Sequence, residues 1–309
     1  MIQQVLATMK SRDTEGPFEL YATRTPGYLF ALLFKWLRVH PIAVTLISMV
    51  IGCASGYFFF HIGNILYNVI GIAMLLIANW LDCADGQLAR MTGKKTQIGR
   101  VLDGFAGDLW FFSIYHCIML GLCTMPMPGL DYEWGIWIWL MGYFSGLYAH
   151  AGQARLADYY RNAHLYFIGA GNDLDSAARI HEEYSGLKWR SGSWFHKLYL
   201  FFYHAYTKAQ EKSTPEFQKL YALVRQKYGN DLPDSLRQAF RAQSKPLMPL
   251  CQILTFDARM GVMFVCLLTG QPWLFFVMEI TAFELLRLYT RRRHERLCRQ
   301  LSASLDSFA

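Results

Sequence analysis

The sequence predicts an all-α fold: a polytopic membrane helix bundle with six transmembrane helices and additional amphipathic helices at the membrane interface. Three observations predict it. Apolar residues make up 53% of the 309 residues and charged residues only 17%. The apolar residues gather into runs of about 20 residues, the length that an α-helix needs to cross a bilayer. Lys and Arg recur in every second connection between these runs.

The six spans are expected at 41–61, 65–90, 98–123, 133–155, 252–270 and 272–290. Basic residues precede the first span, separate the second from the third, fill the linker after the fourth and follow the sixth. The other three connections have no Lys or Arg. This alternation follows the positive-inside rule for a multi-pass membrane protein with both termini in the cytoplasm. In a bacterium the membrane would be the cytoplasmic one.

The spans divide the chain into five regions. We expect a cytoplasmic N-terminal region with an interfacial helix, the first four spans with the candidate catalytic motif, a cytoplasmic helical insertion, the last two spans and a basic tail, at 1–40, 41–155, 156–246, 247–290 and 291–309. Within the insertion, the aromatic-rich segment 194–206 is too short to span and predicts a second interfacial helix. The segment 215–228 predicts an amphipathic helix.

The formal net charge of +7 favours anionic lipid head groups as partners over nucleic acid. The basic residues flank apolar spans and do not form one stripe with base-stacking aromatics, so we expect no nucleic-acid partner. The seven cysteines form no CxxC pair and lie mostly within predicted spans. They predict neither a zinc site nor a disulfide framework.

A cluster of carboxylates lies where the second span ends and the third begins. The chain reads DCADGQLAR at 82–90 and, eight residues later, GRVLD at 99–103. Ionisable groups at membrane depth are costly unless they pair, bind a cation or line a polar cavity. Asp82 and Asp85 are three apart and face one side of a helix, and an antiparallel hairpin could bring Asp103 to them. This cluster is therefore the candidate functional site.

Hard carboxylate oxygens suit Mg²⁺ or Mn²⁺ and not zinc. Gly86 leaves room for a ligand at the backbone, and the planar guanidinium of Arg90 suits a phosphate. The structural alternative is a polar hairpin whose aspartates pair with Arg90 and Arg100.

The two strings resemble the signature of the CDP-alcohol phosphatidyltransferase family, D-x2-D-G-x2-A-R-x8-G-x3-D-x3-D. The resemblance implies that a CDP-alcohol binds through its pyrophosphate to two Mg²⁺ or Mn²⁺ ions, that an acceptor hydroxyl attacks the β-phosphorus and that CMP leaves. It implies metal ligands at Asp82, Asp85 and Asp103, and a nucleotide site shaped by Asp82 together with Gly86, Ala89, Arg90 and Gly99. We also expect membrane lipids as partners and a homodimer.

The last aspartate of the signature is replaced by Gly107, and Asp108 follows one residue late. Three interpretations are open. A single π-bulge in the third span would turn Asp108 toward the metals, as a fourth metal ligand and the catalytic base. Without a bulge Asp108 points about 100° away, and another residue must be the base. Alternatively, catalysis has been lost.

Basic groups near the expected metal level suggest an acceptor site. By their resemblance in position to the arginines of family members that use inositol phosphate, Arg155 and Arg259 are expected to hold an acceptor phosphate. Glu279, near the middle of the sixth span, is expected to pair with Arg259 or to line the cavity. The first choice of substrates is CDP-diacylglycerol and inositol phosphate.

Three other functions are weighed against this choice. One is transfer from CDP-ethanolamine or CDP-choline to a lipid hydroxyl. Another is a membrane scaffold that binds metal and nucleotide without catalysis. A transporter has little support, because the spans contain no inverted repeat.

Overall fold

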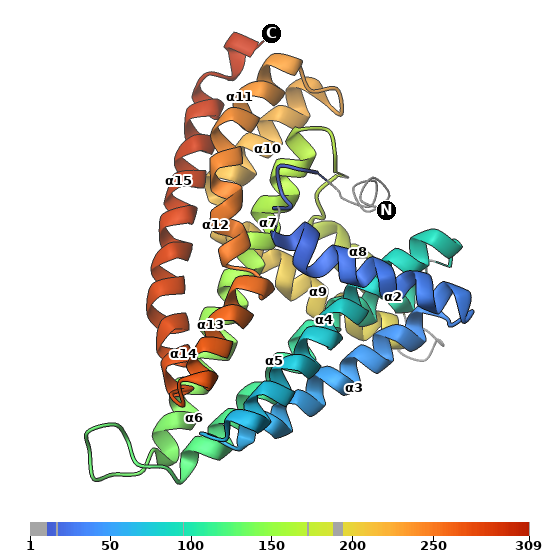
Figure 1. The fold of residues 1–309 in the computed structure, drawn as a ribbon. Helices are drawn as coiled ribbons and strands as arrows, with labels where there is room; N and C mark the ends of the chain where they lie inside the picture. Colours follow the sequence, from blue (N-terminus) through green and yellow to red (C-terminus); the bar gives the residue numbers. More distant parts are fainter. Residues whose placement is uncertain (1–10, 17, 95, 172, 188–193, 309) are drawn as a thin grey trace. The chain divides into compact units, whose positions relative to one another are not determined.

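The computed structural model describes residues 11–16, 18–94, 96–171, 173–187 and 194–308 (Figure 1). These residues form helices and connecting turns, with no β-strand among them. The all-α class that the sequence predicts is therefore confirmed. The chain forms two compact units, one made of residues 15–151 and 257–283 and the other of residues 11–14, 152–256 and 284–308.

The first unit contains three long helices, a helical N-terminal segment and a C-terminal hairpin. Its elements are η1 (Glu19–Arg24), α2 (Thr25–Trp36), α3 (Pro41–Phe60), α4 (Ile65–Thr92), α5 (Gln97–Cys123), α6 (Gly135–Tyr143), η2 (Phe144–His150), α13 (Phe256–Leu268), α14 (Trp273–Met278) and η4 (Glu279–Phe283). The segments η1, η2 and η4 are π-helices.

The helix ends of the first unit follow from local sequence. Pro41 begins α3, and the His40 side chain accepts a hydrogen bond from the backbone N–H of Ile42. Gly93 ends α4 in the left-handed conformation, with φ 69°, which favours glycine. The Thr96 side chain then caps α5 by accepting from the Gly99 N–H at 3.0 Å. These two caps set the turn between α4 and α5.

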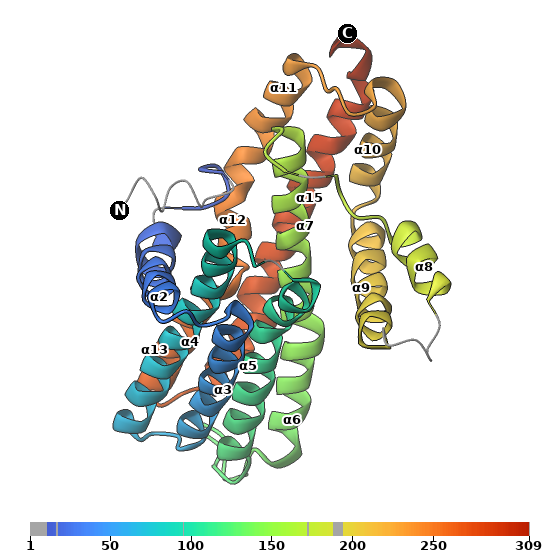
Figure 2. The same ribbon diagram turned by 90° about the vertical axis from the view of Figure 1, so that its right-hand side faces the viewer.

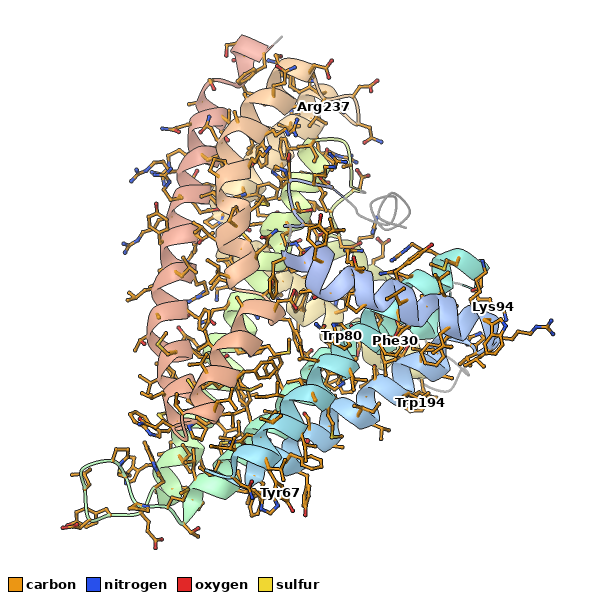
Figure 3. All side chains as sticks on the ribbon, viewed as in Figure 1. Phe30, Tyr67, Trp80, Lys94, Trp194 and Arg237 are labelled. Carbon is orange, nitrogen blue, oxygen red and sulfur yellow. The ribbon has the colours of Figure 1, made fainter. Side chains whose placement is uncertain are left out.

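The core of the first unit is built around α3, which packs against both α4 and α5, while α2 packs on α4 (Figures 1 and 2). A cluster of buried apolar side chains joins α2, α3 and α4: Ala31, Val44, Leu81, Ala84 and Leu88. At its edge the rings of Phe30 and Trp80 stack with centroids 6.4 Å apart (Figure 3). The N-terminal helix is therefore anchored directly on the helix that carries Asp82 and Asp85.

The second unit is a bundle of helices around α15. Its elements are α7 (Ala151–Phe167), α8 (Ala177–Gly186), α9 (Trp194–Ser213), α10 (Pro215–Tyr228), α11 (Asp234–Ser244), η3 (Lys245–Leu247), α12 (Met248–Ile253), α15 (Glu284–Ala303) and η5 (Leu305–Phe308). Both α10 and α11 pack on α15 (Figure 2). The Phe167 and Phe240 rings stack at 3.9 Å. The helix predicted at 215–228 is confirmed with the same bounds.

Four helical stretches are long and apolar enough to cross a membrane: Pro41–Phe60, Ile65–Thr92, Leu102–Cys123 and Asp234–Leu268. They account for the first three predicted spans and for most of the fifth. The predicted spans 133–155 and 272–290 are not among them. Each contains a π-helical segment, η2 and η4 respectively. The count of six is therefore not confirmed.

Candidate metal centre and its surroundings

Three carboxylates of the motif lie together at the end of α4 and the start of α5. One oxygen each from Asp82, Asp85 and Asp103 can be chosen so that all three lie within 4.8 Å of one another. Asp82 and Asp85 are neighbours on one helix face, and the short turn after α4 brings the second turn of α5 beside them. The grouping that the sequence predicts for these three residues is present.

The three carboxylates have different surroundings. Asp85 is 4% exposed, and its Oδ2 accepts a hydrogen bond from the hydroxyl of Thr45 on α3. The Oδ1 atom of Asp82 is buried and has no hydrogen-bond partner among the described residues. Asp103 is exposed. A buried carboxylate oxygen without a donor is costly, and a cation placed among the three oxygens would remove that cost.

The donor set fits a hard divalent cation. All the available ligand atoms are carboxylate oxygens, which suit Mg²⁺ or Mn²⁺. In the described part of the chain neither Asp82 nor Asp85 forms an ion pair with Arg90. The side chain of Arg100 lies outside the described residues. The cluster is therefore better explained by a bound cation than by pairing with Arg90.

Small residues border the carboxylates on both helices. A Cβ atom at Gly86 would meet only the guanidinium of Arg90, at 3.7 Å, so the backbone of α4 is accessible beside an exposed arginine. The absence of a side chain at Gly99 is also explained by packing, because a Cβ there would lie 2.9 Å from the hydroxyl of Thr96. Ala89 is half-buried on α4. Their nucleotide-binding role remains a prediction.

The N-terminal segment is hydrogen-bonded to the motif helix, which the sequence did not indicate. The indole N–H of Trp80 donates to the carbonyl oxygen of Ala22 at 2.8 Å. The side-chain amide of Gln87 donates to the carbonyl oxygen of Arg24 at 3.2 Å. Gly27 allows the close approach, because a Cβ there would lie 2.9 Å from the Cβ of Cys83. The N-terminal segment is thus hydrogen-bonded to the part of α4 that contains Asp82.

A family comparison covers the part of the chain that carries this centre. Residues 38–158 match the family model described as CDP-alcohol phosphatidyltransferase. The match confirms the resemblance that the motif predicts. No curated protein and no solved structure matches the chain.

The third predicted span does not contain the π-bulge expected near Asp108. Helix α5 is α-helical over its whole length, Gln97–Cys123. Gly104 and Gly107 therefore do not interrupt its backbone hydrogen bonds. Asp108 is exposed and lies outside the group formed by the other three carboxylates. The expectation that Asp108 is a fourth metal ligand and the catalytic base is therefore not supported by this arrangement.

Arg259 is not available to an acceptor phosphate in this structure. Its side chain is 1% exposed, and its Nη1 donates to Glu279 Oε1 at 2.6 Å. Glu279 is fully buried. The prediction that Arg259 pairs with Glu279 is confirmed. An acceptor-binding role for Arg259 stays a prediction, and the buried ion pair with Glu279 gives it no support.

Arg155 lies on α7 in the second unit. Its side chain is half-buried, and its backbone carbonyl accepts a hydrogen bond from Gln210 on α9 at 3.2 Å. An acceptor-binding role for Arg155 remains a prediction.

Asp257 ties the C-terminal hairpin of the first unit to the motif helix. Its Oδ1 accepts from the side-chain amide of Asn79 at 3.3 Å, and its Oδ2 accepts from the hydroxyl of Thr23 at 3.4 Å. Asn79 precedes Asp82 by three residues on α4. Asp257 therefore joins α13 and η1 to α4 one turn before Asp82, a connection that the sequence did not reveal because its partners lie 178 and 234 residues away.

Proposed function

We propose that this protein is a metal-dependent phosphotransferase that uses a CDP-alcohol in a membrane. An acceptor hydroxyl attacks the β-phosphorus, a P–O bond forms, and the bond to CMP breaks with its electron pair remaining on CMP. The observation that carries the proposal is the group of three carboxylates at the junction of α4 and α5, inside the segment that matches the family model.

Each residue of the site has a proposed role. Asp82, Asp85 and Asp103 would hold two Mg²⁺ or Mn²⁺ ions, which when bound would supply charge stabilisation for the attacking and leaving oxygens. Thr45 orients Asp85 by its hydrogen bond. The guanidinium of Arg90 binds the pyrophosphate. The small residues Gly86, Ala89 and Gly99 leave space for the nucleotide.

The acceptor is less constrained than the CDP-alcohol. Transfer from CDP-diacylglycerol to inositol phosphate is the first choice from the sequence, and it now rests on Arg155 alone. The burial and pairing of Arg259 favour a second candidate, a neutral lipid alcohol that accepts the head group of CDP-ethanolamine or CDP-choline. Either reaction builds a phospholipid or sphingolipid. We further propose that the protein works as a homodimer.

The test is a transfer assay on the purified full-length protein in detergent, with Mg²⁺ or Mn²⁺ and a panel of CDP-alcohols and acceptors. Asp82→Asn, Asp85→Asn and Asp103→Asn should each abolish metal-dependent release of CMP, because each removes a negative charge from the ion site. Asp131→Asn, in an exposed loop, is the matched control and should keep the wild-type rate. Activity retained in all three motif variants would exclude the proposal.

A catalytically inactive scaffold predicts a different result. It would bind Mn²⁺ and a CDP-alcohol, both measurable by calorimetry, yet release no CMP with any acceptor in the panel.

A further inference from the structure

Five polar side chains form a buried network in the first unit, around the carboxylate of Glu279. Glu279 accepts hydrogen bonds from Arg259 at 2.6 Å, from the hydroxyl of Tyr115 at 2.5 Å and from the hydroxyl of Ser145. Its Oε1 also lies 3.3 Å from Nδ1 of His150. Four helical elements, α5, η2, α13 and η4, each contribute at least one of the five. Two of the five, Tyr115 and Arg259, lie in candidate membrane spans, where ionisable groups indicate function by default.

His150 is the member of this network that reaches the surface of the unit. Its side chain is 14% exposed, whereas Glu279 is fully buried and Arg259 is 1% exposed. The titratable and charged groups that face its ring are Tyr115, Glu279 and Arg259. The network therefore has one accessible end, and that end is an imidazole.

The contacts of His150 fix which ring nitrogen carries the proton. Nδ1 lies 2.9 Å from the hydroxyl of Tyr115 and 3.3 Å from Glu279. The Tyr115 hydroxyl already donates its own hydrogen to Glu279, so it can only accept from the imidazole. Both neighbours of Nδ1 are thus acceptors, and Nδ1 must carry the hydrogen in the neutral ring. Nε2 is left with a lone pair, as in a carboxylate–histidine pair that acts as a base.

The position of His150 relates it to the metal centre through α5. Its ring contacts the ring of Phe111, with centroids 4.6 Å apart. Asp103, Gly107 and Phe111 follow one another at intervals of four residues and lie along one ridge of the helix. Phe111 is about 6 Å further along the axis than Gly107 and about 12 Å further than Asp103. His150 therefore borders the ridge that begins at a metal ligand.

The stretch of ridge between the metal centre and His150 is open. A Cβ atom at Gly107, between Asp103 and Phe111 on this ridge, would meet no atom within 4 Å among the described residues. An acceptor group can enter this space from the apolar surroundings of α5 without displacing a side chain. Gly107, which stands where the signature has an aspartate, thus leaves room for the acceptor.

Two π-helical segments of the first unit contain three of the five network residues. Phe144–His150 contains Ser145 and His150, and Glu279–Phe283 begins with Glu279. The two segments contact each other. Each π turn shifts the following side chains around the helix, and such turns are frequent at functional sites. The irregular backbone is therefore localised on the elements that hold the imidazole and its carboxylate.

We propose that His150 is the catalytic base, and that it accepts the proton of a lipid hydroxyl that enters beside Gly107. This inference rests on the proposed transfer reaction. As the hydroxyl oxygen forms its bond to the β-phosphorus and CMP leaves with the electron pair of the broken bond, the hydroxyl proton moves to Nε2. Glu279 stabilises the resulting imidazolium, and Arg259, Tyr115 and Ser145 hold Glu279 in place. The acceptor class is a neutral lipid alcohol.

The experiment compares His150→Gln with the wild-type protein, full-length in detergent, using the acceptor of the transfer assay. Loss of a general base lowers the rate by about 100-fold or more. We expect kcat to fall by that factor, the KM for the CDP-alcohol to stay within about twofold, and Mn²⁺ affinity to be unchanged. His116→Gln is the matched control, since this half-buried histidine of α5 contacts Tyr143 and Phe112 and not the network. It should keep the wild-type kcat.

The pH–rate profile gives a second readout that partial misfolding of the variant would not imitate, because fewer active molecules lower the rate equally at every pH. The profile should show an acid limb of unit slope, which His150→Gln removes. A His150→Gln protein that keeps the wild-type kcat and the acid limb would overturn the inference while leaving the metal-dependent transfer intact. If the wild-type protein transferred to no acceptor, the proposed function would be excluded, and this inference with it.

Discussion

Gly107 stands four residues after Asp103 on a regular helix, so its Cα continues the ridge on which the metal ligand lies. Asp108 is rotated by about 100° from Gly107, and its side chain is exposed. Moving an aspartate by one residue along an α-helix therefore places its carboxylate on a different face of the helix and does not only shift it along the axis. The sequence could show that an aspartate was one position late, but only the backbone shows that no π turn corrects it.

Asp108→Asn should lower the rate of transfer by less than about threefold, because general-base losses of about 100-fold or more are expected only at the residue that takes the proton. The measurement is steady-state CMP release at saturating substrates, beside Asp103→Asn as the positive control. A loss for Asp108→Asn as large as that for Asp103→Asn would mean that α5 rearranges when substrates bind.

Gly107→Asp should raise the KM for the lipid acceptor and lower kcat, because its side chain would fill the open space between Asp103 and Phe111. The matched control is Gly104→Ala, which adds a methyl group at an open position of α5 outside this ridge. The opposite outcome is a gain of several orders of magnitude in kcat for Gly107→Asp. It would show that the natural chain is a weakened enzyme.

At the scale of elements, the buried pair Arg259–Glu279 joins α13 to η4. Removing one partner of a buried ion pair leaves an uncompensated charge and costs about 3–5 kcal/mol. We therefore expect Arg259→Met and Glu279→Gln each to lower the melting temperature strongly in detergent. The double variant should be more stable than the sum of the two losses predicts, which a double-mutant cycle would measure. Additive losses would show that the two side chains do not interact.

A buried histidine on α15 makes the second unit sensitive to acid. His294 stacks on Tyr160 with centroids 3.7 Å apart, and burial lowers the pKa of His294 from 6.5 to about 3. The unfolded chain therefore binds more protons between pH 6.5 and 3. The stabilising contribution of the neutral ring is complete above pH 6.5 and is lost as the pH falls toward 3.

His294→Phe keeps an aromatic ring against Tyr160 and removes the titration. Between pH 6.5 and 4 its melting temperature should fall less than that of the wild-type protein. His181→Phe, at an exposed position on α8, is the control and should follow the wild-type curve. Parallel curves for His294→Phe and wild type would show that the acid sensitivity arises elsewhere, for example at His164.

The sequence predicted regular elements well and irregular ones not at all. The helix at 215–228 has Pro215 at its first position and Gly229 directly after its end, and both signals are local. The π segments at Phe144–His150 and Glu279–Phe283 carry no such signal. The contact between His150 and Glu279 joins residues 129 positions apart. In the same way, the motif predicted which carboxylates meet, while the burial of Arg259 depends on partners that only tertiary packing brings to it.

At the scale of the whole molecule, the number of membrane crossings decides which side the insertion occupies. Four crossings, at 41–60, 65–92, 102–123 and 234–268, would place residues 124–233 outside, and six would place 156–246 in the cytoplasm. Both counts leave the two termini on the same side of the membrane, which the charge rule predicts to be the cytoplasmic side. The insertion is rich in Lys and Arg, so the charge rule favours six.

Cysteine labelling in intact cells separates the two counts, in a background whose seven native cysteines are replaced. Met127→Cys, in the loop after α5, should be labelled from outside under either count. Ser307→Cys, near the C-terminus, should be protected under either count. Lys212→Cys decides between them, and we expect it to be protected until the membrane is permeabilised, because an outside location would carry the basic insertion across the membrane against the charge rule. External labelling of Lys212→Cys together with protection of Ser307→Cys would establish four crossings and would require η2 and η4 to lie in segments that do not span.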